Sequence, residues 1–437
     1  MPICNPAARF VQRDGPRAGE ASVRLRGPGI AAALALAAAS AAAAPDARTA
    51  AAPQPDPVGE FLARHWVDPL PPQGAPPAKF SPLEASLDPE SCGACHVQQL
   101  RDWKTSLHSR TMGPGLMWQF LLMGQDAANE CMRCHAPLAE QKALMARERG
   151  WQNAPAAPPP SYVPPQLHHE GLVCAACHVR RHARFGPPAR AASKGLGQAG
   201  LPHGGFTAEP AFEDSRFCAT CHQFPPNGAK LDGKLLENTY VEWRASPAAR
   251  QGKACQSCHM PDRRHLWRGI HDPDMVRRAL QVSLQVRRDG GYVRARADLA
   301  NVGAGHYFPT YLVPKVTATL ELVDADGTVR SQLARRVIGR EADLKLAHEI
   351  SDTRLAPGAR MSMDARFRGA PAQARGSYVR LRVVVDPGEH YERLFRSLLE
   401  RPEKLPAGAL PLLREALARL ESGHYELYKL TRPLPAS

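Results

Sequence analysis

The sequence predicts a fold in two parts. The first has short helices and loops with almost no sheet, and the second is an all-β, sandwich-like domain followed by C-terminal helices. Three observations predict this order. A cysteine-histidine motif occurs five times between residues 92 and 259. Apolar and polar residues alternate, as in strands, from about residue 280 to 385, and apolar residues recur at helical spacing after residue 387.

The first 44 residues have the form of a secretory signal peptide. Arg24 and Arg26 precede the apolar run IAAALALAAAS, and small residues surround the expected cleavage point at Ala42–Ala44. The run is too short to span a bilayer, and a buried alanine-rich helix is the alternative. We expect residues 45–81, rich in Pro and Ala, to form a linker. We also expect an exported protein without a transmembrane segment, either periplasmic or on the outer surface.

The repeated motif is C-x-x-C-H, the attachment signature of c-type haem. Two thiols three positions apart can each bond one porphyrin vinyl group, and the following histidine can bind the iron as proximal ligand. Redox disulfides and zinc sites also use cysteine pairs, but neither requires histidine after the second cysteine in every copy. We therefore predict a pentahaem cytochrome c domain over residues 82–275. Its motifs are Cys92, Cys95, His96; Cys131, Cys134, His135; Cys174, Cys177, His178; Cys218, Cys221, His222; and Cys255, Cys258, His259.

The composition agrees with covalently bound haem c. Only 6% of the residues are aromatic, but five porphyrins would supply much of the apolar core of the first part. The formal charge is +14, and cleavage after Ala44 would lower it to +11. Haem propionates would offset most of this excess. Because the basic residues are scattered and the protein is expected to be exported, we exclude nucleic acid as a partner. We expect redox proteins as partners, and the sequence leaves the oligomeric state open.

Within the first part, residues 154–165 and 186–205 are rich in Pro or Gly and cannot hold long regular elements. A short helix is expected over residues 98–108. From residue 276 to 386 we predict a β-sandwich-like domain, which begins with a hairpin whose turn is Asp289-Gly290-Gly291. Further strands are expected over residues 316–322, 361–367 and 379–385. Residues 387–437 are predicted to form a C-terminal helical segment.

The second axial ligand decides what each haem can do. Histidine or methionine closes the iron for electron transfer, and an empty position lets a substrate bind. Twelve histidines lie outside the motifs, which is more than the five distal positions need. The sequence therefore allows two histidine ligands on every haem but does not require them. His108 lies twelve residues beyond His96, a rise of about 18 Å in a helix, so we expect it to serve a neighbouring haem. Further candidate ligands are His168, His169, His203, His265 and His271, and weaker ones are Met112, Met117 and Met260.

Several stretches around the motifs resemble the multihaem cytochromes of the cytochrome c-552/c-554 type. They include CGACHVQQLRDWKTSLH, EGLVCAACH, TYVEWRASPAARQGKACQSCHMP and HLWRGIHD, which together cover most of residues 90–275. The resemblance implies covalent haems in closely packed, mostly bis-histidine pairs that carry electrons in the periplasm. It also implies distal roles for the histidines that match His108, His271 and His265.

The stretch NVGAGHYFPT, residues 301–310, is similar to a loop that follows the haems in such cytochromes. This chain has Tyr311 where a glycine is usual. Gly303 and Gly305 allow a tight bend and a close approach to a flat ring. We expect His306 to bind a haem of the first domain and so to latch the two domains together. The alternative is a structural turn histidine.

The leading functional hypothesis is an electron carrier with five closed haems. The competing hypothesis is an oxidoreductase in which one open haem acts on a small nitrogen or sulfur compound. Pentahaem nitrite reductases typically carry a C-x-x-C-K motif, and all five motifs here end in histidine, which argues against that subclass. A third hypothesis gives the β-domain the main role, as a module that docks the cytochrome to a partner or a cell surface.

Overall fold

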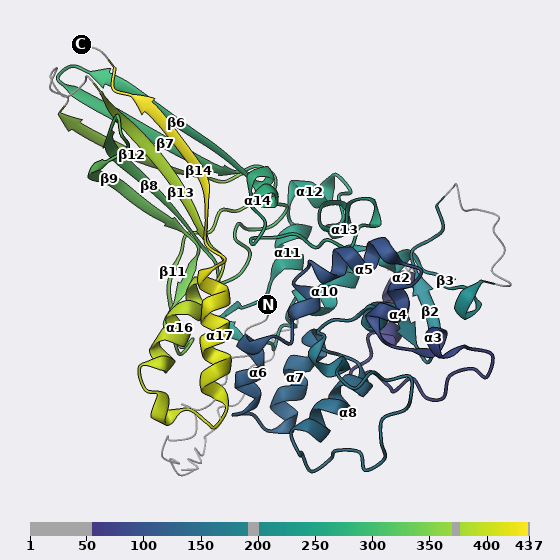
Figure 1. Ribbon diagram of the computed structural model, residues 1–437. Helices are drawn as coiled ribbons and strands as arrows, with labels where there is room; N and C mark the ends of the chain where they lie inside the picture. Colours follow the sequence, from purple (N-terminus) through teal and green to yellow (C-terminus); the bar gives the residue numbers. More distant parts are fainter. Residues whose placement is uncertain (1–54, 191–200, 369–375, 436–437) are drawn as a thin grey trace, which may run out of the picture.

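The computed structural model describes residues 55–190, 201–368 and 376–435 (Figure 1). The predicted signal peptide, residues 1–44, lies outside these ranges. Within them, no helix is both long enough and apolar enough to cross a membrane. A body of short helices carries the first part of the chain, and a β-domain projects from it.

The first part consists of short helices joined by loops, as the sequence predicts. Its strands have only two to four residues each: β1 (Val179–Arg180), β2 (Ala183–Gly186), β3 (Thr207–Ala208), β4 (Lys230–Leu231) and β5 (Lys234–Leu235). The helices before residue 180 are α2 (Pro57–His65), α3 (Pro82–Ala85), α4 (Pro89–Gly93), α5 (Val97–Lys104), α6 (Pro114–Phe120), α7 (Gln125–His135), α8 (Ala139–Glu148) and α9 (Cys174–His178). Those after it are α10 (Ser215–His222), α11 (Thr239–Arg244), α12 (Pro247–Arg250), α13 (Cys255–His259) and α14 (Pro273–Ala279). Single 3-10 turns η2 (His108–Arg110), η3 (Leu167–His169), η5 (Pro202–Gly204), η6 (Pro210–Glu213) and η7 (Pro261–Arg263) complete this part.

The described part of the expected linker, residues 55–81, is packed against the rest of the first part of the chain. Asp56 caps helix α2, and the helix buries Phe61 and His65. Arg180 donates from Nε to the backbone oxygen of His65 at 2.6 Å and lies over the Trp66 ring at 4.9 Å. The Pro/Ala composition did not reveal this helix because its apolar face becomes buried only against residues more than a hundred positions away.

The β-domain is a sandwich of two antiparallel sheets. One sheet has the order β12-β7-β6, and the other has the order β14-β13-β8-β9. The main strands are β6 (Leu280–Asp289), β7 (Tyr292–Asn301), β8 (Lys315–Asp324), β9 (Val329–Ile338), β12 (Arg360–Arg368), β13 (Ser377–Asp386) and β14 (Tyr425–Pro433). The short strands β10 (Arg340–Ala342) and β11 (Glu349–Asp352) pair beside them. The predicted hairpin is confirmed, because Asp289 pairs with Tyr292 across the turn.

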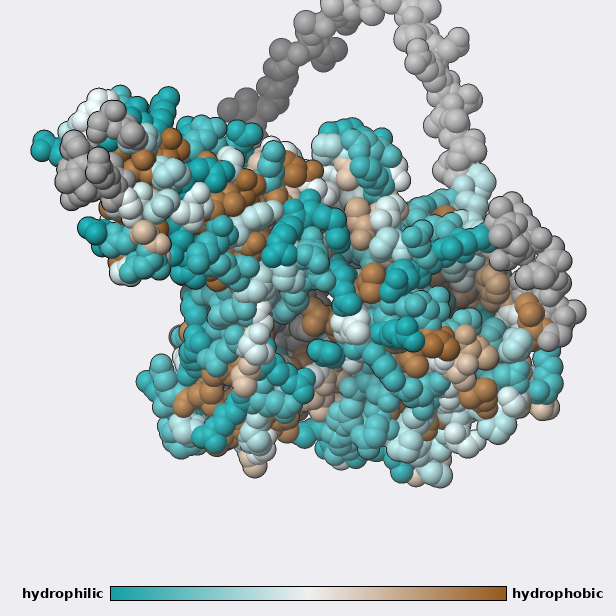
Figure 2. Space-filling view, turned by 45° about the horizontal axis from the view of Figure 1, so that its top comes forward, coloured by the Kyte–Doolittle hydropathy of each residue, from teal (hydrophilic) through white to brown (hydrophobic). Residues whose placement is uncertain are grey.

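Alternation along the strands builds the core of the sandwich. Val379, Leu381, Val383 and Val385 of β13 are fully buried, and so are alternate residues of β7 and β8. The outward-facing positions are mainly polar. Figure 2 shows a largely hydrophilic surface on which hydrophobic side chains gather in separate patches, several of them over the β-domain.

The C-terminal segment is only partly helical. Helices α16 (Glu389–Leu399) and α17 (Ala409–Glu421) form as expected, and their apolar faces pack together and against Trp118 of α6. The prediction of a helical segment up to residue 437 is wrong for residues 425–433, which form strand β14 and pair with β13. In this strand Leu427 turns into the sandwich core, and neighbouring side chains stay partly exposed.

Two valines of the same sheet test how the sandwich is stabilised. Val383 in β13 is 0% exposed, and Val329 in β9 is 47% exposed. Val383→Ala should lower the free energy of unfolding by about 2–3 kcal/mol, because it removes buried methyl groups and leaves a cavity. Val329→Ala should change it by less than about 0.5 kcal/mol. Urea denaturation followed by circular dichroism measures both, and equal effects would contradict this account of the core.

Candidate functional site

Each C-x-x-C-H motif lies on a short helical segment. The second, third, fourth and fifth motifs fall within α7, α9, α10 and α13, and each of these helices ends at the motif histidine. The first motif spans the end of α4 and the turn before α5. On a helix, residues three and four apart lie on one face. Both thiols and the imidazole of a motif are therefore presented to the same side, as attachment to one porphyrin requires.

Thiols of different motifs meet in pairs. Cysteine side chains of the first and third motifs lie close enough to shift each other's pKa, and so do those of the second and fourth and of the fourth and fifth motifs. These contacts are Cys92 with Cys174, Cys134 with Cys221, and Cys218 with Cys255. These contacts place the motifs in two groups, the first with the third, and the second and fifth with the fourth.

Three motif histidines are oriented by backbone carbonyls. The Nδ1 atoms of His135, His178 and His259 lie 2.7–2.8 Å from backbone oxygens of Thr111, Phe185 and Arg268. A histidine that donates from Nδ1 keeps Nε2 free as a metal ligand. In His135, Nε2 is buried and makes no hydrogen bond. These residues fit covalent haem, because each ring is fixed in the tautomer that an iron ligand needs.

Three motif histidines also face a second imidazole. Ring centres are 6.1 Å apart for His178 and His265, 6.3 Å for His222 and His108, and 6.4 Å for His259 and His306. Two imidazoles bound to opposite sides of one metal ion, with bonds of about 2 Å, have ring centres about 6 Å apart. The expectation that His108 lies opposite a motif other than its own agrees with this arrangement. The haem ligation itself stays a prediction.

Trp267 lies between two of the facing histidines. Its ring centre is 4.7 Å from that of His108 and 5.0 Å from that of His265. These two histidines face the fourth and the third motif, respectively. The tryptophan therefore holds the two imidazoles in fixed positions and links neighbouring motifs.

The remaining candidate ligands have different surroundings. His203 directs Nδ1 to the Gly205 oxygen at 2.8 Å, and its charge adds to burial in lowering the pKa of His96. His271 lies just before α14, and within the described ranges it makes no ring contact with a motif histidine. The distal roles predicted for these two histidines stay predictions.

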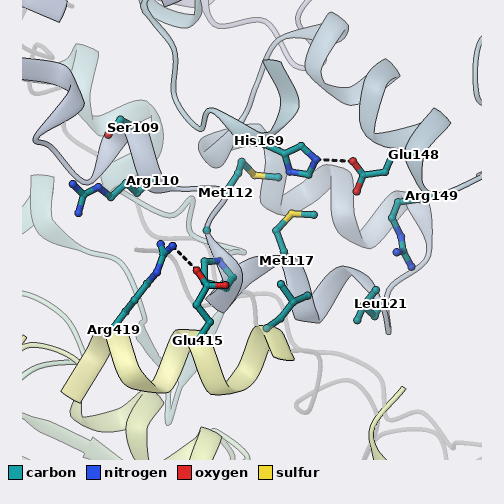
Figure 3. Close-up of a pocket in the computed structure, with 13 residues that line it drawn as sticks. Ser109, Arg110, Met112, Met117, Leu121, Glu148, Arg149, His169, Glu415 and Arg419 are labelled. Carbon is teal, nitrogen blue, oxygen red and sulfur yellow. Dashed lines mark hydrogen bonds and ion pairs between the residues drawn. The ribbon is translucent and has the colours of Figure 1, made fainter. Parts of the chain in front are cut away.

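The adjacent histidines of η3 face a carboxylate instead of a motif. His168 and His169 each direct Nε2 to Oε2 of Glu148 at 2.6 Å. Glu148 therefore engages the Nε2 atom of each histidine, while Nδ1 of His168 is buried without a hydrogen bond. The distal roles predicted for His168 and His169 stay predictions. Glu148 and His169 also line a cavity of about 490 Å³ between α6, α8 and α17 (Figure 3). No motif cysteine or motif histidine is among the residues that line it.

The loop that carries His306 docks on helices α11 and α12. A Cβ atom on Gly305 would lie 2.9 Å from Cβ of Ala248 and 3.3 Å from the Trp243 ring, and one on Gly303 would overlap the Arg278 carbonyl. Both glycines therefore permit close packing of the loop on its neighbours, and the predicted approach to a haem ring stays a prediction. His306 directs Nδ1 to the Tyr307 oxygen at 2.8 Å, which leaves Nε2 directed toward His259.

A buried carboxylate fastens this loop. Glu242 of α11 accepts hydrogen bonds from the Tyr307 amide at 3.1 Å and the Thr310 hydroxyl at 2.9 Å, and it pairs with Arg354 at 3.1 Å. Arg354 also donates to the Thr310 oxygen and lies over the Tyr307 ring. Sequence reasoning missed Arg354, because nothing in its neighbourhood marks it as a contact between domains.

Comparison with known proteins supports the fold. No protein-family model and no curated protein sequence matches the chain. Among solved structures, it is similar to the penta-heme cytochrome c552 from Thermochromatium tepidum, with a TM-score of 0.57 and 20% sequence identity. The match covers 81% of this chain and 100% of that chain. The chain therefore has a multihaem cytochrome fold with a β-rich C-terminal region.

Close packing of the loop can be tested at Gly305. Gly305→Ala should lower the free energy of unfolding by about 1–3 kcal/mol, because the new methyl group collides with Ala248 and Trp243. Gly291→Ala, where a Cβ would meet nothing within 4 Å, is the matched control and should have little effect. Chemical denaturation measures both variants. Equal stabilities would show that the loop does not pack closely on α11 and α12.

Proposed function

We propose that this protein is an exported multihaem c-type cytochrome that carries electrons one at a time between periplasmic redox partners. The observation that carries the proposal is the set of three imidazole pairs with ring centres 6.1–6.4 Å apart. Each pair has the spacing of two axial ligands on one iron, and bis-histidine ligation favours electron transfer over substrate binding. The fold shared with a penta-heme cytochrome supports the same assignment.

Five haems c would be held by the ten motif cysteines, with the five motif histidines as proximal ligands. When bound, the haems supply one-electron redox chemistry. The protein then fixes the imidazole rings through backbone carbonyls and excludes water from His135 and its neighbours. His265, His108 and His306 would be the distal ligands of the third, fourth and fifth motifs, and the position of His203 favours the first.

The thiol contacts support a branched route for electrons. They join the first motif to the third, and they join both the second and the fifth to the fourth. Trp267 adds a link between the third and the fourth, because it contacts both of their facing histidines. Haems held at these five motifs would exchange electrons by way of the haem at the fourth motif. The first motif would reach it through the third.

One observation favours the alternative function, an oxidoreductase that acts on a small nitrogen or sulfur compound. Three motif histidines face a second imidazole, and among the described residues no such ring contact is found for His135 or His96. Since the position of His203 favours the first motif, the second motif is the place where an open iron would lie. The third hypothesis, a docking role for the β-domain, rests only on the way that this domain projects from the helical body (Figure 1).

The cofactor content is the first test of the proposal. Mass spectrometry of the exported protein should give the mass of the processed chain plus five haems, because every motif has a complete set of attachment residues. A chain without haem, or one that contains zinc, would overturn the proposal. Electron paramagnetic resonance with and without nitrite, hydroxylamine or carbon monoxide then separates the two functions. A low-spin spectrum that does not respond supports the carrier, and a high-spin signal that shifts supports the enzyme.

His306 provides the second test. His306→Ala should convert one low-spin haem to high spin, because the haem of the fifth motif would lose the imidazole opposite His259. His348→Ala is the control, since His348 is an exposed histidine of the same domain. Absorption and electron paramagnetic resonance spectra report the change. Identical spectra for both variants would show that His306 is a structural turn residue.

A further inference from the structure

Two buried carboxyl groups are joined by a chain of two hydroxyl groups at the contact between the domains. Thr239 Oγ1 lies 2.5 Å from Oε1 of Glu237 and 2.7 Å from Oγ1 of Thr310. Thr310 Oγ1 lies 2.9 Å from Oε2 of Glu242. Glu237, Thr239 and Glu242 belong to the haem region, and Thr310 belongs to the loop that carries His306. This series of hydrogen bonds therefore crosses the boundary between the two domains.

The hydrogen atoms in this series of hydrogen bonds can be counted. The four side chains make three oxygen–oxygen contacts of hydrogen-bond length, and each contact needs one proton between its two oxygen atoms. Thr239 and Thr310 supply one hydroxyl proton each. If both carboxyl groups were ionised, the hydroxyls would donate outward to them, and the 2.7 Å contact between the two threonines would have no proton. A buried contact of this kind is unfavourable, so the geometry requires a third proton.

Burial makes a protonated carboxyl reasonable here. Glu237 is 1% exposed and Glu242 is 8% exposed. Burial raises the pKa of Glu242 to about 6, although Arg354, Thr310 and the Tyr307 amide oppose this shift. Arg354 is itself shared with Asp352, at 2.9 Å. Glu237 acts electrostatically on four other titratable groups, which are Cys134, His222, His306 and Tyr311.

We propose that Glu237 and Glu242 share one proton through Thr239 and Thr310, and that this site couples proton binding to electron transfer. The proton has two positions in this series of hydrogen bonds, one on each carboxyl group. A protonated Glu237 donates to Thr239, which donates to Thr310, which donates to Glu242. In the other state a protonated Glu242 donates to Thr310, and each remaining bond reverses. Moving the proton between the carboxyls therefore needs no movement of heavy atoms.

The site lies beside two proposed haem ligands, since Glu237 acts electrostatically on both His222 and His306. If haems are held by these ligands, one electron from a redox partner would add one negative charge beside the pair. Near the pKa of the pair, some molecules have lost the shared proton to water, and the added charge would favour its return. When the electron leaves to the next redox partner, that fraction of the proton would go back to water. The coupling rests on the proposed function, whereas the shared proton depends only on the carboxyl and hydroxyl groups.

Infrared spectroscopy of the full-length holoprotein tests the shared proton. The wild type at neutral pH should show the C=O band of a protonated carboxylic acid, shifted in heavy water. This band is distinguished from that of Glu170, whose pKa burial raises to about 7, by its survival in Glu170→Gln. Glu237→Gln should remove the band, because an amide N–H can donate to Thr239 in place of the proton. Thr310→Val should also remove it, because without Thr310 both carboxyls can ionise. Absence of the band in the wild type, or its persistence in both variants, would overturn the proposal.

The pH dependence of the haem midpoint potentials tests the coupling. In the wild type, a tenfold change in proton concentration should shift the affected potential by up to about 59 mV, the limit for one proton per electron. Glu237→Gln should reduce this slope. Glu321→Gln is the matched control, since Glu321 is a buried carboxylate paired with Arg380 in the β-domain, and its slope should equal that of the wild type. Equal slopes in all three proteins would overturn the coupling. A protein without haem would instead overturn the proposed function, and the infrared result would still stand.

Discussion

The structure depends on one constraint, the short and nearly constant distance between facing imidazole rings that come from distant parts of the chain. His108 meets His222, His178 meets His265, and His259 meets His306, all with ring centres just over 6 Å apart. A chain that must satisfy several such distances has little freedom to form long regular elements. The helices of the first part are accordingly short, and four of them end at a motif histidine. The Pro-rich stretch at residues 154–165 lies in a loop between them.

In the β-domain, the strands that can be predicted from the sequence are those that bury one face in the core. Strands β6, β7, β8, β12 and β13 have one face in the core, so their apolar residues alternate with polar ones and the pattern is visible. Strand β9 lies at the edge of its sheet and is mostly exposed, with arginines at positions 330, 335 and 336. Its sequence does not alternate because it has little core to cover. Strand β14 follows two helices, and pairing with β13 determines its position. The sequence of residues 425–433 alone does not indicate this pairing.

The candidate site was predictable in its parts and not in its pairings. The motif spacing identifies ten cysteines and five histidines, because one porphyrin dictates where they stand. Helical rise makes His96 an unsuitable partner for His108, but only the folded chain brings His108 to His222. His168 and His169 precede a motif, as a distal ligand does, and only the folded chain shows that Glu148 of α8 contacts both of their Nε2 atoms. The contacts of Glu242 with Arg354 and Thr310 likewise exist only after two distant segments have met.

The position of His306 has a consequence for how the protein matures. Ribosomes make the five motifs first, and the segment that would complete the coordination of the fifth haem follows them in the β-domain. That segment is held in place by β7 and β8 on either side and by Arg354 further along the chain. The fifth haem would therefore pass through a stage in which it is attached but still accessible to solvent on one side. Folding of the sandwich would close that side, so a haem bound there would reach its final electronic state only after the β-domain had folded.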